Sequence, residues 1–263
     1  MCLILVAWKS HPKYPCIVAA NRDEIHQRAT LPGPWWADRP QILAGRDLVA
    51  GGTWLGITRT GRWAALTNFR SLDLPRQNAR SRGTLVTNVL ESAGSTADQL
   101  RALSEVGRDY NGFNLMFSDG ERLGVFESLL GEGRPLLPGI YGLSNHLLDT
   151  PWPKVQKAKA RLQTLLNDLS DPESVLEILR DDRPAHDEEL PKTGVSLEWE
   201  RLLSSAFVRG AEYGTRCSTL IRIDAQGSAF FDEWSWDASG SPSGRCSFAF
   251  ERRGPLPDHD PIH

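Results

Sequence analysis

The chain begins with two short apolar runs that predict a β-hairpin. Leu3–Trp8 and Cys16–Ala20 contain no polar residue apart from the thiol, and Lys9–Pro15 between them holds two prolines. Neither run alternates polar with apolar positions, which is typical of strands that are covered on both faces. The pattern therefore predicts an N-terminal hairpin buried inside a layered fold.

The hairpin also allows a prediction of register. If its turn centres near Pro12, Trp8 lies opposite Cys16 and Cys2 lies opposite Arg22. This arithmetic follows from the antiparallel pairing of two strands joined by one turn. We therefore expect the residues around Arg22 to lie beside the start of the chain.

Further apolar runs predict more strands, separated by turn-forming pairs such as Asp119-Gly120 and Gln226-Gly227. These runs are Gly52–Thr58, Trp63–Asn68, Phe113–Phe117, Leu123–Glu127, Cys217–Asp224, Ser228–Trp234 and Cys246–Phe250.

Helices are predicted between these groups of strands. Ser95 and Asp98 form a capping-box pattern ahead of an apolar face. The longest helix is predicted from about Trp152 to Leu169, with lysines such as Lys154 expected on its solvent side. Asp171-Pro172 then predicts the start of another helix.

The order of these elements predicts an α+β fold, in which two antiparallel sheets stack face to face with helices outside (αββα). Buried sheets of this kind explain the missing alternation. We expect a single domain over residues 1–250, with Arg180–Gly194 as a long surface loop. The polar, proline-containing tail Glu251–His263 is expected to be flexible.

Composition narrows the function classes. A net charge of −3 gives no basic surface for nucleic acid. The cysteines Cys2, Cys16, Cys217 and Cys246 lack the paired spacing of a zinc site or a small disulfide scaffold, which favours a reducing compartment. Leu3–Trp8 is too short to span a bilayer and has no basic segment before it. We therefore expect a cytoplasmic protein without a transmembrane segment.

The chemistry of Cys2 has two interpretations. A free cysteine in a strand is often a small buried hydrophobe. Removal of Met1, however, would leave Cys2 with a free α-amine, whose ordinary pKa of about 7.7 to 8.0 suits a base near neutral pH. The predicted pairing brings Asn21–Glu24 beside this cysteine. Those four residues are either a solvated strand end or part of a site.

Eight short motifs then occur in an order that resembles the NRDE family, whose animal members are called transport and Golgi organisation protein 2. They are MCLI, NRDE at 21–24, GGTWLGI at 51–57, ALTN at 65–68, SRG at 81–83, NGFNL at 111–115, YGLSN at 141–145 and YGTRCST at 213–219. The family resembles the N-terminal nucleophile hydrolases, which are four-layer αββα sandwiches. The resemblance extends to about Phe250.

The resemblance implies a catalytic set, through cysteine enzymes such as bile salt hydrolase and penicillin V acylase. Cys2 would be the nucleophile and Asp23 would orient its α-amine; Asn68 and Asn145 would bind the oxyanion or substrate, and Arg216 would tune the site. The chain departs from those enzymes in having Ala20 where they have an arginine. Asn68 and Asn145 have a plainer interpretation as turn residues at strand ends.

The substrate is expected to be a small acylated molecule whose amide or thioester bond is hydrolysed or whose acyl group is transferred. Predicted substrate contacts are Asn21, Arg22 and Trp54, although tryptophans of this kind often anchor a core instead. This chemistry requires no cofactor.

A second function from a different class is binding without catalysis. The family resemblance links the chain with haem trafficking and lipids, so the ligand would be haem or an acyl-CoA. Candidate haem ligands are Cys2, His26 and His146, but the Cys-x-x-Cys-His haem-attachment motif is absent from the sequence. Asp258, His259, Asp260 and His263 resemble a metal cluster only in residue type, so no metal site is predicted.

Overall fold

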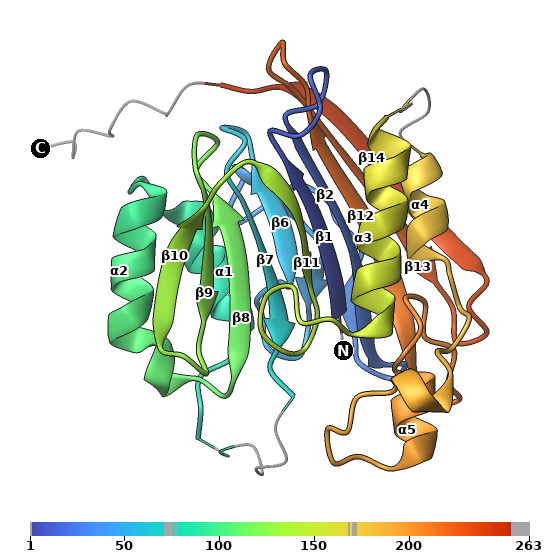
Figure 1. The fold of residues 1–263 in the computed structure, drawn as a ribbon. Helices are drawn as coiled ribbons and strands as arrows, with labels where there is room; N and C mark the ends of the chain where they lie inside the picture. Colours follow the sequence, from blue (N-terminus) through green and yellow to red (C-terminus); the bar gives the residue numbers. More distant parts are fainter. Residues whose placement is uncertain (1, 71–75, 77, 168, 170–172, 254–263) are drawn as a thin grey trace, which may run out of the picture.

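The fold is known from a computed structural model, which describes residues 2–70, 76, 78–167, 169 and 173–253. Two antiparallel six-stranded sheets form its centre (Figure 1). In the first sheet the order is β11-β1-β2-β12-β13-β14, and in the second it is β10-β9-β8-β7-β6-β4.

The first sheet comprises β1 (Cys2–Trp8), β2 (Cys16–Ile25), β11 (Gly139–Leu143), β12 (Tyr213–Ile223), β13 (Ser228–Trp236) and β14 (Pro242–Glu251). The second comprises β4 (Ile42–Ala44), β6 (Leu55–Thr58), β7 (Trp63–Asn68), β8 (Phe113–Ser118), β9 (Leu123–Glu127) and β10 (Glu132–Leu136). A small ribbon pairs β3 (Thr30–Leu31) with β5 (Arg46–Asp47).

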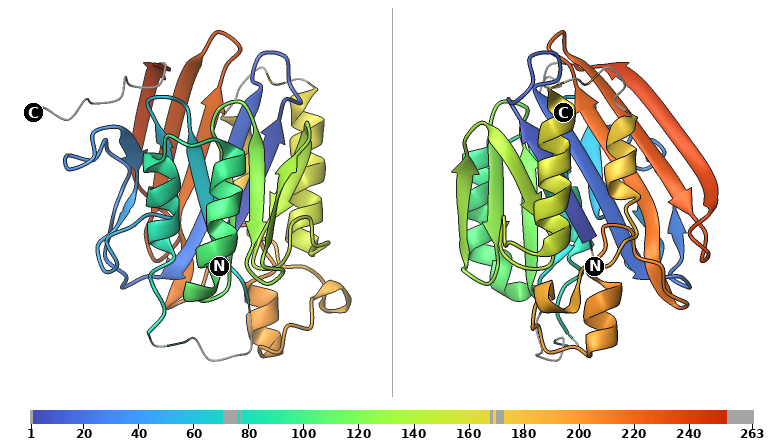
Figure 2. Two further views of the ribbon diagram at one scale, coloured as in Figure 1. Left: turned by 90° about the vertical axis from the view of Figure 1, so that its left-hand side faces the viewer. Right: turned by 45° about the vertical axis from the view of Figure 1, so that its right-hand side comes forward.

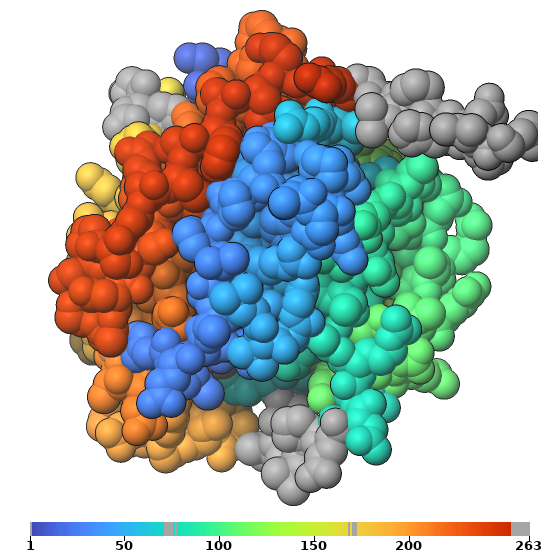
Figure 3. All heavy atoms as spheres, turned by 180° about the vertical axis from the view of Figure 1, so that it is seen from behind, coloured from blue at the N-terminus to red at the C-terminus, as the bar shows by residue number. Residues whose placement is uncertain are grey.

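Helices cover the outer face of each sheet. The second sheet is covered by α1 (Gly83–Glu91) and α2 (Thr96–Val106), and the first by α3 (Pro153–Leu166) and α4 (Ser174–Leu179) (Figures 1 and 2). A fifth helix, α5 (Leu197–Leu202), and two 3-10 turns, η1 (Gly107–Asp109) and η2 (Asp187–Glu189), complete the secondary structure of the described residues. On the opposite side, the segment from β3 to β6 lies between the C-terminal strands and α1 (Figure 3).

Three hydrophobic clusters fill the spaces between these layers. One lies between α3, α4 and the first sheet, one between the two sheets, and one between the second sheet and α1 and α2. Residues along β1 alternate between two of them: Leu3 and Leu5 belong to the helix side, whereas Ile4 and Val6 belong to the inter-sheet side. The αββα prediction is therefore confirmed.

The predicted hairpin register is confirmed as well. Trp8 pairs with Cys16, and Cys2 pairs with Arg22. Of the two interpretations of residues 21–24, the structure does not support a solvated strand end, since β2 continues to Ile25 and Asn21 to Asp23 are buried. The reason is a tertiary contact: β12 pairs with β2 along its full length, including Tyr213 with Ile25.

The helix predictions need three corrections. The capping box of Ser95 and Asp98 is present, but α1 was not predicted, and α3 ends at Leu166 rather than Leu169. Lys154 is buried, not on the solvent side. It is four residues before Ala158, which places it on the buried face of α3.

Two sequence predictions fall partly or wholly on residues outside the described set. Asp171-Pro172 lies outside it, as do residues 254–263 of the predicted tail, whereas Glu251 ends β14.

The short strands β10 and β11 were missed by the sequence pattern. Among the described helices, none has the length and apolar character needed to cross a membrane.

Candidate active site around Cys2

Cys2 begins β1 at the end of the first sheet, where its side chain is partly exposed. By strand alternation it belongs to the face of Ile4, toward the second sheet. Burial raises the pKa of the Cys2 thiol, and the charge of Asp23 adds to that rise. The positive charge of the chain terminus, the main-chain N–H of Asp23 and the charge of Arg22 act in the opposite direction. The Asp23 N–H and the Arg22 guanidinium therefore offset part of the free-energy cost of burying a thiolate at Cys2.

Asn145 connects Cys2 with the second sheet. Its Oδ1 accepts a hydrogen bond from the Cys2 main-chain N–H at 3.3 Å, and its Nδ2 donates to the Asn68 carbonyl at 2.8 Å. Ser144 Oγ donates to the Cys2 carbonyl at 2.9 Å. The Asn145 side chain is 1 % exposed. These bonds fix the main chain of Cys2 on both sides and place the end of β7 close to it.

Asp23 lies on the other face of β2, toward the helices. Its Oδ1 accepts a hydrogen bond from Thr215 Oγ1 at 2.7 Å, and its carbonyl accepts one from the Tyr213 hydroxyl at 2.9 Å. Burial raises the pKa of the Asp23 carboxyl. The positive charge of the chain terminus opposes that rise most, followed by the charge of Lys154, the bond from Thr215 and the charge of Arg22. Asp23 is thus a buried carboxyl one position beyond the strand partner of Cys2.

Arg22 and Trp54 form a stacked pair beside the thiol. The guanidinium of Arg22 lies 4.5 Å from the centre of the Trp54 ring and is 5 % exposed. Its Nη2 is 3.5 Å from Glu24 Oε2 and 3.7 Å from Asp47 Oδ2. Arg22 thus takes part in a carboxylate network that holds its positive charge next to Cys2.

Two of the predicted residues make contacts away from the thiol. Asn21 Nδ2 donates to the carbonyls of Leu179 (2.8 Å) and Ala206 (2.7 Å), so both of its amide hydrogens are engaged. Arg216 Nη1 donates to the carbonyls of Ile25 (3.0 Å) and Arg28 (3.1 Å). Asn21 therefore braces β2 against the helix layer, and Arg216 holds the turn that follows β2.

Sequence reasoning missed two cations near Cys2. Arg82, in the SRG motif, donates to the Gly112 carbonyl at 3.0 Å and interacts electrostatically with Cys2 and Glu24. Lys154, on the first turn of α3, is 4 % exposed and interacts electrostatically with Asp23 and Cys2. The signal for Lys154 was its helical spacing with Ala158, and the signal for Arg82 was its place in the SRG motif.

Both candidate haem-ligating histidines are bonded inside the fold. His146 Nδ1 lies 2.9 Å from Thr150 Oγ1, and its ring contacts Phe69 and Trp152. His26 Nε2 lies 2.9 Å from the Gly210 carbonyl. Across the described residues, no group of three or more His, Cys, Asp or Glu side chains is arranged to hold a metal ion.

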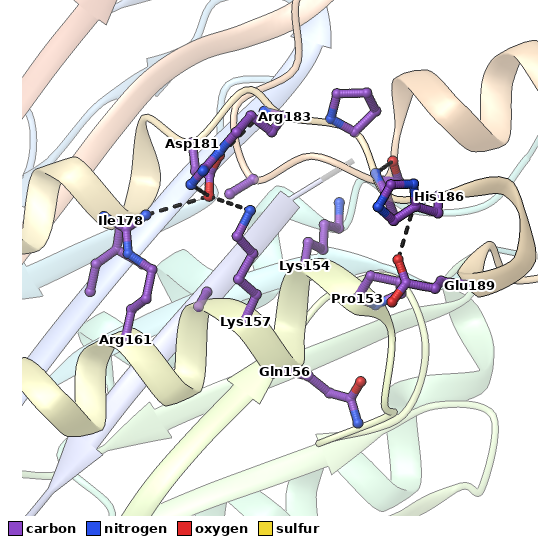
Figure 4. A pocket seen from close by; sticks show the side chains of 15 residues that line it. Pro153, Lys154, Gln156, Lys157, Arg161, Ile178, Asp181, Arg183, His186 and Glu189 are labelled. Carbon is purple, nitrogen blue, oxygen red and sulfur yellow. Dashed lines mark hydrogen bonds and ion pairs between the residues drawn. The ribbon is translucent and has the colours of Figure 1, made fainter.

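A cleft of about 370 Å³ lies on the helix side of the first sheet (Figure 4). Its walls come from α3, the end of α4 and the segment 181–189, most of which is exposed as predicted. Lys157, Arg161 and Arg183 converge on Asp181, at 2.7, 3.4 and 2.7 Å. Lys154 extends from α3 between Lys157 and His186.

Comparison with known proteins identifies the family. The family described as "Transport and Golgi organisation 2" matches residues 1–238. The chain belongs to this family. The Transport and Golgi organization protein 2 homolog of Bos taurus is 37% identical over 259 residues, covering 89% of this chain and 93% of the relative. The Homo sapiens homolog is 36% identical over 263 residues with the same coverage. The Drosophila melanogaster protein is 27% identical over 260 residues, covering 89% and 91%.

Solved structures show the same fold at low sequence identity. The mutant C2A of conjugated bile acid hydrolase from Clostridium perfringens has a TM-score of 0.53 and 10% identity, covering 95% of this chain and 92% of that one. The N-acylethanolamine-hydrolyzing acid amidase ortholog of Caenorhabditis elegans has a TM-score of 0.50 and 12% identity, covering 84% and 92%. The chain therefore has an N-terminal nucleophile hydrolase-like fold.

Proposed function

We propose that this chain, once Met1 is removed, is a cysteine hydrolase or acyltransferase that acts on the amide or thioester bond of a small acylated substrate. The observation that carries the proposal is the hydrogen bond from the Cys2 main-chain nitrogen to Asn145 Oδ1. Removal of Met1 converts that nitrogen into an α-amine, and Asn145 already orients it next to the thiol of the same residue.

The α-amine is the base in this mechanism. It takes the proton of the Cys2 thiol as the sulfur bonds to the substrate carbonyl carbon and the carbonyl electron pair moves to oxygen. Collapse of this intermediate breaks the carbon–nitrogen bond, and the leaving amine takes the proton from the α-ammonium. Water then attacks the thioester, releases the acid and restores the thiol.

Asn68 is the proposed oxyanion donor. It ends β7, its side chain is exposed, and Asn145 Nδ2 holds its main-chain carbonyl. One such donor contributes about 3 to 4 kcal/mol to stabilising a tetrahedral intermediate. Arg22 lies opposite Cys2 in the pairing of β1 with β2, and Trp54 stacks on its guanidinium; these two side chains are the proposed substrate contacts.

The names of two structural relatives also support this proposal. Two structural relatives are hydrolases by name, and the description C2A implies that the bile acid hydrolase has a cysteine at its second position. Haem binding has less support, because His26 and His146 are each engaged in hydrogen bonds within the fold.

Acylation of Cys2 tests the proposal. The Met1-free chain is incubated with p-nitrophenyl octanoate, and the acyl adduct is located by intact mass and peptide mapping. We expect one octanoyl group on Cys2, with adduct formation lost in Cys2→Ala. Cys246→Ala removes another partly exposed thiol and serves as the matched control, which should retain labelling. Equal labelling of Cys2→Ala and wild type would overturn the proposal.

A further inference from the structure

Lys154 is a buried cation that core packing does not explain. It is 4 % exposed, and its Nζ has no hydrogen-bond partner within the described part of the chain. Its position in α3 is otherwise apolar, in line with Ala158 and Leu162, which belong to the hydrophobic cluster on the first sheet. Burying an ammonium without hydrogen bonds is costly, so an apolar residue here would stabilise the fold more.

The surroundings of Lys154 point to one counter-charge. The titratable or charged groups around it are Cys2 on β1, Asp23 on β2, Arg70 after β7, and Lys157, Asp181, His186 and Glu189 along the cleft. Arg70 is paired with Glu200 at 2.9 Å, and Asp181 is matched by Lys157 and Arg183.

Among these groups, Asp23 carries the charge that acts most strongly on Lys154. Asp23 lies on the helix-facing side of β2, and α3 packs against that side of the first sheet. Asn21, two residues before Asp23, bonds the carbonyl of Ala206, which lines the same cleft as Lys154. Burial lowers the pKa of Lys154 to about 8, and the charge of Asp23 opposes that fall.

We propose that Lys154 is a positioning residue, which keeps Asp23 ionised and the Cys2 thiol acidic when the α-amine of Cys2 is free. The inference rests on the function proposed above. A cation beside a carboxyl favours the carboxylate, and beside a thiol it favours the thiolate. The same charge disfavours protonation of the α-amine, so that the amine stays available as the base.

The carboxyl carbon of Asp23 reports on this pairing without any reaction. Chains labelled with ¹³Cγ-aspartate are titrated by NMR, and Asp23→Asn assigns the resonance. In Lys154→Met the Asp23 midpoint should rise by about one pH unit, the usual effect of losing a neighbouring opposite charge. Lys154→Arg should restore the wild-type midpoint, and Lys157→Met, on the same helix, should leave it unchanged. An unchanged midpoint in Lys154→Met would overturn the proposal.

A second measurement needs no substitution at Lys154. In a chain with an uncleaved extension before Met1, which has no α-amine beside Asp23 to titrate in the same range, the Asp23 resonance should show a further inflection near pH 8 as Lys154 loses its proton. A single inflection through this range would overturn the pairing, even if Lys154→Met does not fold.

The effect on Cys2 is measured by alkylation with iodoacetamide. In the Met1-free chain the pH midpoint of the alkylation rate should be higher in Lys154→Met than in wild type. If the Asp23 midpoint moves while Cys2 never acylates, the pairing stands and the proposed function fails. If Cys2 acylates but Lys154→Met changes neither midpoint, the function stands and the role of Lys154 is refuted.

Discussion

The substitution Asn145→Asp isolates the bridge between Cys2 and β7. It keeps the acceptor for the Cys2 N–H but replaces the amide group that donates to the Asn68 carbonyl. One hydrogen bond of about 1 kcal/mol is lost, and leaving its partner unsatisfied adds about 1 to 3 kcal/mol. Because the side chain is 1 % exposed, we expect an overall loss of about 2 to 4 kcal/mol near neutral pH.

The loss should depend on pH. Burial raises the pKa of the new carboxyl in the folded state above its unfolded value of about 3.9, so the folded chain prefers the protonated acid. The destabilisation is therefore small below that unfolded pKa and grows as the pH rises above it. Urea unfolding at pH 5 and pH 7.5 measures the difference directly.

Asn88→Asp is the matched control for this prediction. Asn88 is exposed on α1, so the same chemical change should alter stability by less than about 0.5 kcal/mol. If Asn145→Asp matched the control at both pH values, Asn145 would not hold the two sheets together at this point.

Two further substitutions test the surroundings of the site. Asn21→Ala removes three buried hydrogen bonds, to two carbonyls and the hydroxyl of Ser218, and should cost about 3 kcal/mol by thermal or urea unfolding. A stable Asn21→Ala chain with altered substrate affinity would instead support the predicted substrate contact. Gly52→Ala places a Cβ 2.5 Å from the Gly83 carbonyl carbon, which is main chain and cannot yield cheaply. We expect Gly52→Ala to lower the free energy of unfolding by about 1 to 3 kcal/mol. A melting temperature equal to that of the wild type would contradict the close packing of Gly52 against Gly83.

Much of the fold followed from local pattern. Unbroken apolar runs predicted buried strands, and the prolines between Trp8 and Cys16 fixed the first register. The missed strand β10 has sparse apolar positions, since Glu132 and Arg134 alternate with glycine and proline, and the missed strand β11 is interrupted by Gly142. Strand β10 is held by its hairpin with β9, and β11 by a long-range pairing with β1 that local propensity does not report.

The site was predictable only in part, and for a similar reason. Strand pairing placed Cys2 beside Arg22 from arithmetic alone. In contrast, the orientation of Arg216 depends on an irregularity in the β12 register between Thr215 and Cys217, which no local pattern indicated. Helical spacing places Lys154 on the buried face of α3. The general expectation that lysine faces solvent led to the opposite prediction.

The central claim is that a free α-amine on Cys2 activates the thiol. The direct test compares two chains, one beginning at Cys2 and one carrying an uncleaved extension before Met1, by the rate of acyl-thioester formation on Cys2 across pH. The account predicts that only the chain beginning at Cys2 is acylated rapidly, with loss of rate as the amine becomes protonated. Equal acylation rates in the two chains would contradict it.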